Sequence, residues 1–265
     1  MRKVNADDLI EFKRLYNSGF YLREIVPLVD FGYDAIKRNL RKSGVNLVNK
    51  GIFKRKYYLG KETYFDNIDS QEKAYFLGLL CADGNVYKNR VKLTLESKDC
   101  YIIQKFADCL ETSKPVQKKS YPSHQGCETC NLEIVSDIMV SSLLKLGVTP
   151  NKSLTLCLPT IDDHLISHFI RGYFDGDGCF TFGGRKGTHN NAYFSIVGSL
   201  SMISSVQDIL MIKCCLNKTK LIPQGNVYYV MYGGNKQVRR IAEFLYKDST
   251  VLLTRKYEKI KHLLI

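Results

Sequence analysis

The chain has 265 residues, 45% of them hydrophobic, and a formal net charge of +13 at pH 7. This composition is typical of a folded globular protein with one sizeable core and room for a small additional domain, and it excludes a largely disordered chain. No apolar run approaches the ~20 residues of a membrane-spanning helix, and acidic residues near the amino terminus argue against a leader peptide, so we expect no membrane segment, no targeting signal and a cytoplasmic or nucleoid-associated protein.

Positive charge is concentrated at the start of the chain. Residues 1–61 contain fourteen Lys or Arg and six Asp or Glu, which is +8 of the total of +13. The spacing of apolar residues predicts three helices there, at 7–18, 22–29 and 33–43, within a small domain of residues 1–48. A basic helical domain of this kind is typical of nucleic-acid binding.

The third predicted helix carries much of this charge. It follows a short second helix and a turn at residues 30–32, and the arrangement resembles the helix-turn-helix of resolvase and homeodomain-like proteins. The resemblance implies that the third helix enters the major groove of DNA. Its candidate DNA contacts are Lys37, Arg38, Arg41 and Lys42. The alternative is a packing module whose charged face is only solvated.

The next segment, residues 49–70, is predicted to be a linker. It mixes basic and aromatic residues without helical periodicity, and its candidate phosphate contacts are Lys54, Arg55 and Lys56. Contacts of this kind make binding depend on salt without specifying much sequence. A solvated hinge is the alternative interpretation.

Two short segments of the remaining chain repeat one another. FLGLLCADG at 76–84 and IRGYFDGDG at 170–178 are each an apolar helical run that ends in an aspartate and a glycine. Each run has two small residues four positions apart, Gly78 and Ala82 in the first and Gly172 and Gly176 in the second. Glycine inside a helix costs about 1 kcal/mol relative to alanine. We therefore expect these small residues to let the two helices pack closely along one face.

The aspartates at the ends of the two runs are Asp83 and Asp177, followed by Gly84 and Gly178. We expect both glycines to end their helices in the left-handed conformation. Packed in parallel, the helices would bring the two aspartates together at their carboxyl ends, where the helix dipole disfavours negative charge. A bound cation would relieve that repulsion.

The predicted elements after the two runs recur in the same order. The first run is followed by strands at 85–87 and 90–96, a helix at 101–110, a strand at 129–135 and a helix at 138–146, and the second by strands at 179–182 and 192–197, a helix at 202–214, a strand at 227–232 and a helix at 238–246. Such a repeat indicates one structural unit used twice. We predict an α+β fold with two pseudo-symmetric αββαββα repeats, at 71–158 and 159–265, whose antiparallel sheets bind DNA.

Both runs resemble the dodecapeptide motif of the LAGLIDADG homing endonucleases, because their small residues, acid and glycine stand in the same order. The resemblance spans both repeats and implies a monomeric enzyme of intron homing that cuts both strands of a long asymmetric DNA site and leaves short 3′ overhangs. It assigns the catalytic metal-binding acids to Asp83 and Asp177. Asp175 matches the usual aspartate at the sixth motif position, from which Cys81 departs.

Phosphodiester hydrolysis requires an activated water, stabilisation of charge on the phosphate and a neutralised leaving oxygen, and a divalent metal supplies all three. We expect Asp83 and Asp177, with the main-chain carbonyls of Ala82 and Gly176, to hold Mg²⁺, with Mn²⁺ as a possible substitute, because hard cations prefer oxygen ligands. No histidine adjoins either acid in the sequence, so activation by metal is favoured over an imidazole base.

Two lysines are expected near the scissile phosphates by analogy with the family. Lys152 lies in PNKS at 150–153, which closes the first repeat, and Lys256 lies in TRKY at 254–257, which closes the second. A lysine at such a position can stabilise charge on the phosphate. Ordinary surface lysines are the alternative.

Recognition of the DNA sequence is expected to fall to the sheets, because a twisted antiparallel ribbon fits the major groove. The candidate contacts are Asn85, Tyr87, Lys88, Arg90, Lys92, Gln117 and Lys119 in the first repeat, and Thr181, Arg185, Lys186, His189, Asn191, Gln224 and Tyr228 in the second. Each of them could equally be a solvated residue of a strand, since the sequence does not fix the register.

The nine cysteines are expected to be free thiols, because several lie within apolar segments. Cys127, Cys130 and His124 suggest a zinc site, but a tetrahedral site needs four ligands and no second spaced pair follows. Zinc binding is therefore disfavoured.

Two other functions are compatible with the same fold: a regulator that binds DNA without cutting it, and a maturase that assists splicing of an intron RNA. Retention of both acids argues against the regulator, whereas a maturase can keep them. The expected partner is double-stranded DNA. Because both repeats lie in one chain, no partner protein is implied and a monomer is expected.

Overall fold

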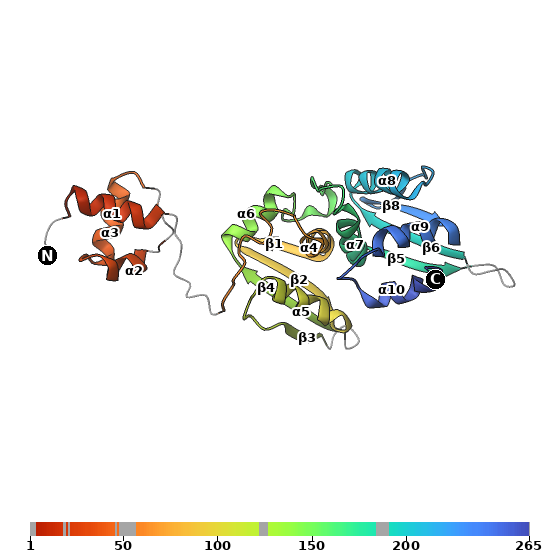
Figure 1. Ribbon diagram of the computed structural model, residues 1–265, viewed down its shortest axis with the longest axis horizontal. Coiled ribbons are helices and arrows are strands. Elements are labelled where there is room, and N and C mark those ends of the chain that lie inside the picture. The colour runs from red at the N-terminus through yellow and green to blue at the C-terminus, as the bar shows by residue number, and fades with distance from the viewer. Residues whose placement is uncertain are drawn as a thin grey trace. The chain divides into compact units, whose positions relative to one another are not determined.

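The chain folds into two units, Met1–Lys56 and Tyr57–Ile265. The computed structural model describes residues 4–17, 20, 22–45, 47, 57–121, 127–183 and 191–264 (Figure 1). None of the helices within these ranges is long and apolar enough to cross a membrane.

The first unit is a bundle of short helices. Its elements are α1 (Ala6–Asn17), α2 (Leu22–Ile25) with the 3₁₀ turn η1 (Val26–Leu28), and α3 (Tyr33–Lys42). They enclose a separate core of Phe12, Leu15, Ile25, Phe31, Ile36 and Leu40. The three predicted helical segments are confirmed, but the second changes from α to 3₁₀ geometry at Pro27, which has no N–H to continue the α-helical hydrogen bonds.

The second unit contains the same series of elements twice. The first half is α4 (Gln71–Asp83), β1 (Gly84–Tyr87), β2 (Arg90–Glu96), α5 (Cys100–Cys109), β3 (Gln117–Tyr121), β4 (Cys127–Val135) and α6 (Asp137–Lys145). The second half is α7 (Ile166–Asp177), β5 (Gly178–Gly183), β6 (Asn191–Gly198), α8 (Leu200–Cys214), β7 (Ile222–Gln224), β8 (Val227–Gly233) and α9 (Asn235–Tyr246), and α10 (Thr254–Ile260) follows. The predicted αββαββα repeats are confirmed.

Each half forms an antiparallel four-stranded sheet. The strand orders are β1-β2-β4-β3 and β5-β6-β8-β7, which are equivalent in the two halves. Side chains alternate along the central strands, so that every second residue of β2 and of β6 is buried. The buried residues join a core that is shared by both halves and by the helices. Each sheet therefore has one face under helices and one open face.

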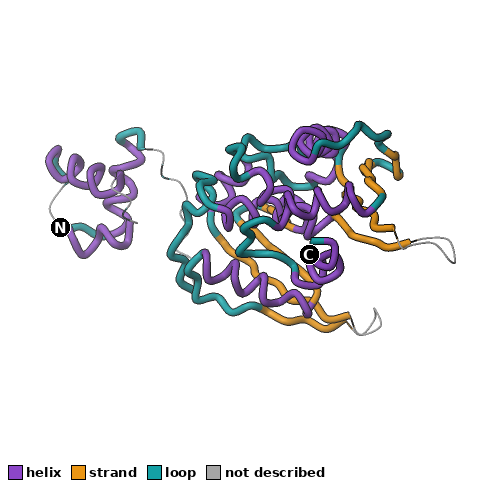
Figure 2. The backbone as a smooth tube through the Cα atoms, turned by 45° about the vertical axis from the view of Figure 1, so that its right-hand side comes forward, coloured by secondary structure: helices purple, strands orange, loops and turns teal. Residues whose placement is uncertain are grey.

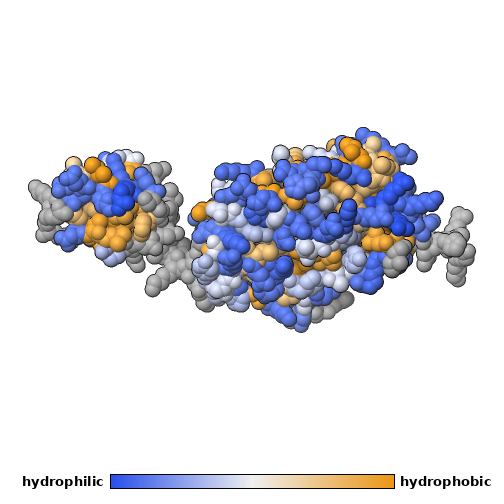
Figure 3. Space-filling model, viewed as in Figure 1, coloured by the Kyte–Doolittle hydropathy of each residue, from blue (hydrophilic) through white to orange (hydrophobic). Residues whose placement is uncertain are grey.

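Helices α4 and α7 lie side by side between the two sheets (Figure 1). Figure 2 shows the strands in two groups, with helices packed beside them. The face of the second unit seen in Figure 3 is mainly hydrophilic, with smaller apolar areas between the polar ones. The helix pair is thus the structural centre that joins the two repeats.

The second unit begins earlier than the predicted end of the linker at residue 70. Leu59 forms a β-bridge with Thr112, and the side chains of Tyr64 and Phe65 are only 6% and 1% exposed. The Phe65 ring packs 6.2 Å from that of Phe106 in α5. Residues 57–70 therefore belong to the folded unit, because their aromatic side chains are needed in its core. The predicted phosphate contacts Lys54, Arg55 and Lys56 lie outside the described residues.

The prediction that Gly84 and Gly178 are left-handed caps is wrong. Gly84 has φ −77° and ψ 146°, and Gly178 has φ −114° and ψ 168°, so both are extended and lead directly into strands. A Cβ at Gly84 would lie 2.4 Å from the carbonyl oxygen of Leu80, and one at Gly178 would lie 2.1 Å from Cδ2 of Phe174. Both positions need glycine for close packing rather than for a positive φ.

Candidate active site

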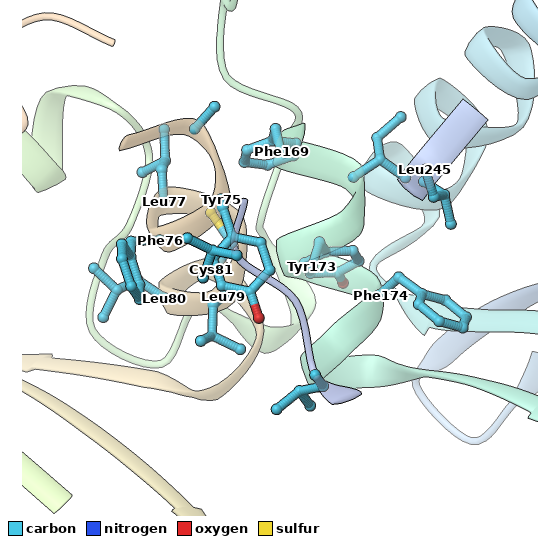
Figure 4. Close-up of a cluster of buried hydrophobic side chains, with 14 of the residues drawn as sticks. Tyr75, Phe76, Leu77, Leu79, Leu80, Cys81, Phe169, Tyr173, Phe174 and Leu245 are labelled. Carbon is cyan, nitrogen blue, oxygen red and sulfur yellow. The ribbon is translucent and has the colours of Figure 1, made fainter. Parts of the chain in front are cut away.

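The backbones of α4 and α7 touch at two glycines. A Cβ at Gly78 would lie 2.1 Å from the carbonyl oxygen of Phe169, and a Cβ at Gly172 would lie 1.9 Å from that of Tyr75. Neither distance is possible for a real side chain, so any larger residue would push the helices apart. Figure 4 shows the side chains of Tyr75 on α4 and of Phe169 and Tyr173 on α7 in the packed region around this contact.

The other two predicted interface residues meet near the ends of the helices. A Cβ at Gly176 would lie 2.3 Å from Cβ of Ala82 and 3.0 Å from Oδ2 of Asp83. Because Asp177 follows Gly176 directly, the end of α7 that carries one acid is packed against the end of α4 that carries the other. The structure thus places Asp83 and Asp177 at one site.

The environment of these two carboxyl groups is unfavourable for charge. By solvent accessibility Asp83 is exposed and Asp177 is half-buried. Burial raises the pKa of Asp83, although Lys256 and Lys152 oppose the shift. Burial and then the negative charge of Asp83 raise the pKa of Asp177 to about 6. Two acids that repel each other at two helix carboxyl ends are a site that a cation would stabilise.

Lys152 and Lys256 lie beside the acids but are not surface residues. Their exposed fractions are 7% and 5%. Lys152 donates a hydrogen bond from Nζ to the carbonyl oxygen of Gly84, the residue after Asp83. Burial lowers its pKa. The alternative interpretation of Lys152 as an ordinary surface lysine is therefore excluded, and the same holds for Lys256.

Lys256 makes more hydrogen bonds to the main chain than Lys152 does. Its Nζ donates to the carbonyl oxygens of Phe174, Asp175 and Gly178 at 2.7, 2.7 and 2.5 Å. An ammonium group has three N–H donors, so these bonds use all of them. Burial lowers the pKa of Lys256 to about 8, although the charge of Asp175 opposes the shift. In this arrangement Lys256 holds the end of α7 and has no N–H left for a phosphate, which differs from the role expected from the sequence.

The open face of the first sheet is polar and partly charged. The register places Asn85, Lys92 and Glu133 in one row across β1, β2 and β4, and Tyr87, Arg90 and Val135 in the next row. Gln117 and Lys119 of β3 are exposed and pair with Asn131 and Thr129 of β4. Lys88 lies at the hairpin turn with φ 52°. The first-repeat candidates therefore share one side of the sheet or its hairpin.

In the second sheet the register corrects one candidate. Tyr228 pairs with Gly198 and alternates with buried Val230, so it belongs to the helix side of β8, whereas its neighbour Tyr229 pairs with Val197 on the open face. Thr181, Asn191 and Gln224 are on the open face as expected. Arg185, Lys186 and His189 lie outside the described residues.

A hollow of about 620 Å³ opens beside Asp177 on this face. It is lined by Cys179, Ser195, Val197, Gln224 and Tyr229 among others. Sequence reasoning missed Ser195, Val197 and Tyr229. Only the alternation of β6 and β8 could have indicated them, once the register was known.

No protein-family model and no curated protein sequence matches the chain. Among solved structures, the chain is similar to meganuclease I-SmaMI bound to uncleaveable DNA, with 12% sequence identity, a TM-score of 0.50, and coverage of 72% of this chain and 87% of that one. It is also similar to the LAGLIDADG meganuclease I-CpaMI bound to uncleaved DNA, with 10% identity, a TM-score of 0.50, and coverage of 74% and 90%.

The chain has the LAGLIDADG fold. Its departure from the LAGLIDADG motif, Cys81, is buried in α4, where the second repeat has Asp175. Asp175 is fully enclosed: its Oδ2 accepts hydrogen bonds of 2.8 Å from the Tyr75 hydroxyl and from the Leu253 N–H. Burial raises the pKa of Asp175 to about 6. The two LAGLIDADG helices thus meet in an asymmetric way at the sixth motif position.

A second buried polar group in this LAGLIDADG core is Arg171, which sequence reasoning did not single out. It donates from Nε to the Val251 carbonyl at 2.9 Å and from Nη1 to the Leu245 carbonyl at 2.8 Å. Its guanidinium lies 5.4 Å from the centre of the Tyr75 ring. An arginine inside an apolar helical motif was the available signal. Through these hydrogen bonds, Arg171 links α7 to the end of α9 and to the segment that follows α9.

The basic helix of the first unit leaves most of its candidate contacts accessible. Arg38, Arg41 and Lys42 of α3 are exposed, and Lys37 is half-buried with Nζ 5.6 Å from the centre of the Tyr33 ring. Nδ2 of Asn39 donates to the Ala35 carbonyl of its own helix at 2.8 Å. The exposed residues form a cationic surface on α3.

The eight cysteines whose side chains are described are free thiols, and the side chains of Cys127 and His124 lie outside the described part of the chain. Cys130 is buried, and its Sγ contacts the carbonyl oxygens of Leu95 and Glu96 at 3.7 and 3.4 Å. Within the described ranges no group of three or more His, Cys, Asp or Glu side chains is arranged to hold a metal. The candidate metal site has only two such side chains, Asp83 and Asp177, and its other oxygen donors would be main-chain carbonyls.

Proposed function

We propose that the protein is a site-specific DNA endonuclease that cuts both strands of a double-stranded target. The observation that carries the proposal is the packing of the end of α7 against Asp83, with Asp177 as the next residue after the contact. Two equivalent acids at the centre of a pseudo-symmetric unit suit the two strands of a duplex. The similar structures I-SmaMI and I-CpaMI, both bound to DNA, support this function.

The residues at the site fit a hard divalent cation. The donors available are the carboxylates of Asp83 and Asp177 and main-chain carbonyls at the helix ends, including those of Ala82 and Gly176, and oxygen donors suit Mg²⁺ or Mn²⁺. Burial and then the charge of Asp83 raise the pKa of Asp177, although Lys152 and Lys256 oppose the shift, and a cation bound to both carboxylates would lower it further. When bound, such an ion would activate water and offset negative charge on the phosphate.

The side chains of the protein would supply the other functions needed for cleavage. Asp83 and Asp177 would each serve mainly one strand, and cuts at offset positions would leave short 3′ overhangs. Lys152 places its charge next to Asp83 with one described hydrogen bond to the main chain, so its other donors can face a phosphate oxygen. Lys256 would fix the α7 end that presents Asp177.

Binding would be divided among the two sheets, α3 and the basic segment before residue 57. The open faces of the two sheets would follow the major groove on either side of the cut. The exposed cations of α3 would add contacts of helix-turn-helix type, and the basic segment before residue 57 would contact phosphates. Since both acids come from one chain, the enzyme would act as a monomer on an asymmetric site.

Selection from a pool of duplexes with randomised sequence tests this function. The purified protein is incubated with the pool in Mg²⁺, and newly formed ends are captured by ligation of an adaptor and sequenced. We expect one long site, double-strand breaks by the wild-type protein, and loss of double-strand breaks in Asp83→Asn and in Asp177→Asn.

The matched control is Asp248→Asn. Asp248 is exposed and has φ 54°, a conformation that asparagine adopts well. This variant should cut like the wild-type protein. Selective binding of DNA without any cutting in Mg²⁺ or Mn²⁺ would refute the endonuclease and favour the regulator, and selective binding of an intron RNA would favour the maturase.

A further inference from the structure

The open faces of the two sheets differ in chemistry at equivalent positions. Asn85 and Cys179 each lie two residues after an acid, and each begins a row across its sheet. The register continues these rows to Lys92 and Glu133 in the first sheet, and to Ser195 and Met231 in the second. Beside the acids, then, an amide and two charged groups in one half correspond to a thiol, a hydroxyl and a thioether in the other.

The neighbouring rows show the same difference. In the first sheet they are Tyr87–Arg90–Val135 and Thr94–Asn131–Gln117, and in the second they are Thr181–Tyr193–Gly233 and Val197–Tyr229–Ile222. In these rows the first sheet has an exposed cation, Arg90, and an exposed amide, Gln117, whereas the Asn131 amide is buried and donates to the Gln117 carbonyl. The three described rows of the second sheet contain no charged side chain and no amide. The amides of this face, Asn191 and Gln224, lie outside these rows, and Gln224 is on the rim of the hollow beside Asp177.

The second face is also shaped differently next to its acid. Small side chains at Cys179 and Ser195, whose Sγ and Oγ lie 3.3 Å apart, form part of the lining of the hollow beside Asp177. Met231 is 39% exposed although it is apolar. A methyl-sized group on a base edge can enter such a hollow and contact Val197 there without leaving a buried donor unpaired, and Met231 lies outside the hollow in the row of Ser195.

These differences between the two sheets correspond to differences between the base edges exposed in the major groove. Arginine and lysine bind O6 and N7 of guanine, and asparagine and glutamine bind adenine. Apolar side chains contact the C5 methyl group of thymine. Arg90 and Lys92 both lie beside Glu133, and Arg90 pairs with it at 2.8 Å, so the carboxylate can orient them towards a base.

We propose that the two repeats read their half-sites by different chemistry: the first sheet reads guanine through Lys92 and Arg90, and the second reads thymine methyl groups through Met231, Val197 and the hollow beside Asp177. This inference rests on the proposed endonuclease function. The Lys92 row and the hollow adjoin the acids and would read the base pairs nearest the cleavage position, and the Arg90 row, at the hairpin end of β1, would read base pairs farther out.

Base analogues in the selected target test the proposal. Thymine is replaced by uracil, which lacks only the C5 methyl, and guanine by 7-deazaguanine, which lacks N7, in one half-site at a time. Binding is measured by fluorescence anisotropy without added divalent metal. We expect about fourfold weaker binding for each contacted methyl removed from one half-site, and about fivefold or more for a contacted guanine changed in the other.

Two variants assign the effects to the sheets. Lys92→Met should remove the penalty for 7-deazaguanine and keep the penalty for uracil, and Met231→Ala should do the reverse. Both residues are on open faces, and unchanged melting temperatures would show that the fold is intact.

Different experimental results would overturn this inference and the proposed function. Selection of a single site with equal uracil penalties in both half-sites, or penalties that neither variant abolishes, would overturn the inference alone. A protein that selects no DNA sequence would overturn both.

Discussion

The hydroxyl group of Tyr75 in α4 donates a 2.8 Å hydrogen bond to Oδ2 of Asp175 in α7, across the interface of the two repeats. Asp83 and Asp177, the last residues of the two helices, are 94 positions apart (177 − 83). The same offset relates Tyr75 to Phe169 and Cys81 to Asp175. The symmetric counterpart of the tyrosine–aspartate pair is therefore phenylalanine with cysteine. A carboxylate at position 81 would find no hydroxyl at 169, which gives a physical reason for the departure of Cys81 from the motif.

The Tyr75–Asp175 bond predicts a specific loss of stability. Tyr75→Phe removes one of the donors to a buried carboxyl group, so we expect the free energy of unfolding to fall by about 1–3 kcal/mol. Urea unfolding measures the change. Tyr87→Phe, at a tyrosine that is 57% exposed, is the matched control and should have no effect. In Tyr75→Phe with Asp175→Asn, the loss should be smaller than the sum of the single losses, and strict additivity would contradict the coupling.

Replacement of the buried lysines Lys152 and Lys256 should reduce the stability of the protein by unequal amounts. Lys256→Met leaves three main-chain carbonyls at the end of α7 without their donor, whereas Lys152→Met removes one described bond. Since an unpaired buried polar group costs about 1–3 kcal/mol, we expect Lys256→Met to destabilise the protein clearly more. Lys259→Met, at an exposed position of the same helix α10, is the control.

A second measurement separates positioning from phosphate binding. With excess Mg²⁺ and at a temperature where all variants are folded, Lys152→Met should slow the cutting step more than Lys256→Met does. The opposite order would show that Lys256 leaves its carbonyls to act on the phosphate.

The sequence was sufficient for most elements of the fold, because their signals are local, although it did not locate β3, β7 or α10. Periodicity located the strands 90–96 and 227–232 within a residue of their observed ends, and the repeated motif correctly predicted that Asp83 and Asp177 end their helices. It failed where the outcome depends on the path of the backbone or on strand pairing. Gly84 looked like a left-handed cap but is extended, and a Cβ there would meet the Leu80 carbonyl of the preceding turn. Tyr228 looked like a DNA contact until pairing with Gly198, far away in the sequence, placed it on the helix side.

The glycines at the helix contact predict a steric effect. Gly172→Ala would place Cβ 1.9 Å from the Tyr75 carbonyl oxygen, and rigid backbone on both sides cannot yield. We expect a loss of at least about 3 kcal/mol in the free energy of unfolding, or no folded protein. Gly183→Ala is the control, because its nearest neighbour would be the Tyr193 ring at 3.8 Å. Equal melting temperatures for the two variants would show that α4 and α7 do not touch as described.

The raised pKa of Asp177 predicts opposite effects of pH on the metal-free and metal-bound protein. A carboxyl group whose pKa is higher in the folded than in the unfolded state stabilises the fold fully below its unfolded value of about 4. That contribution is lost as pH rises through about 6. A cation competes with the proton for the same oxygens, so the rise in melting temperature caused by Mg²⁺ should be absent at low pH and grow as pH rises through about 6. Differential scanning fluorimetry of the full chain with and without Mg²⁺ measures both trends. Asp177→Asn should reduce the Mg²⁺ effect at every pH, and an effect of Mg²⁺ that is independent of pH and of this substitution would place the ion elsewhere.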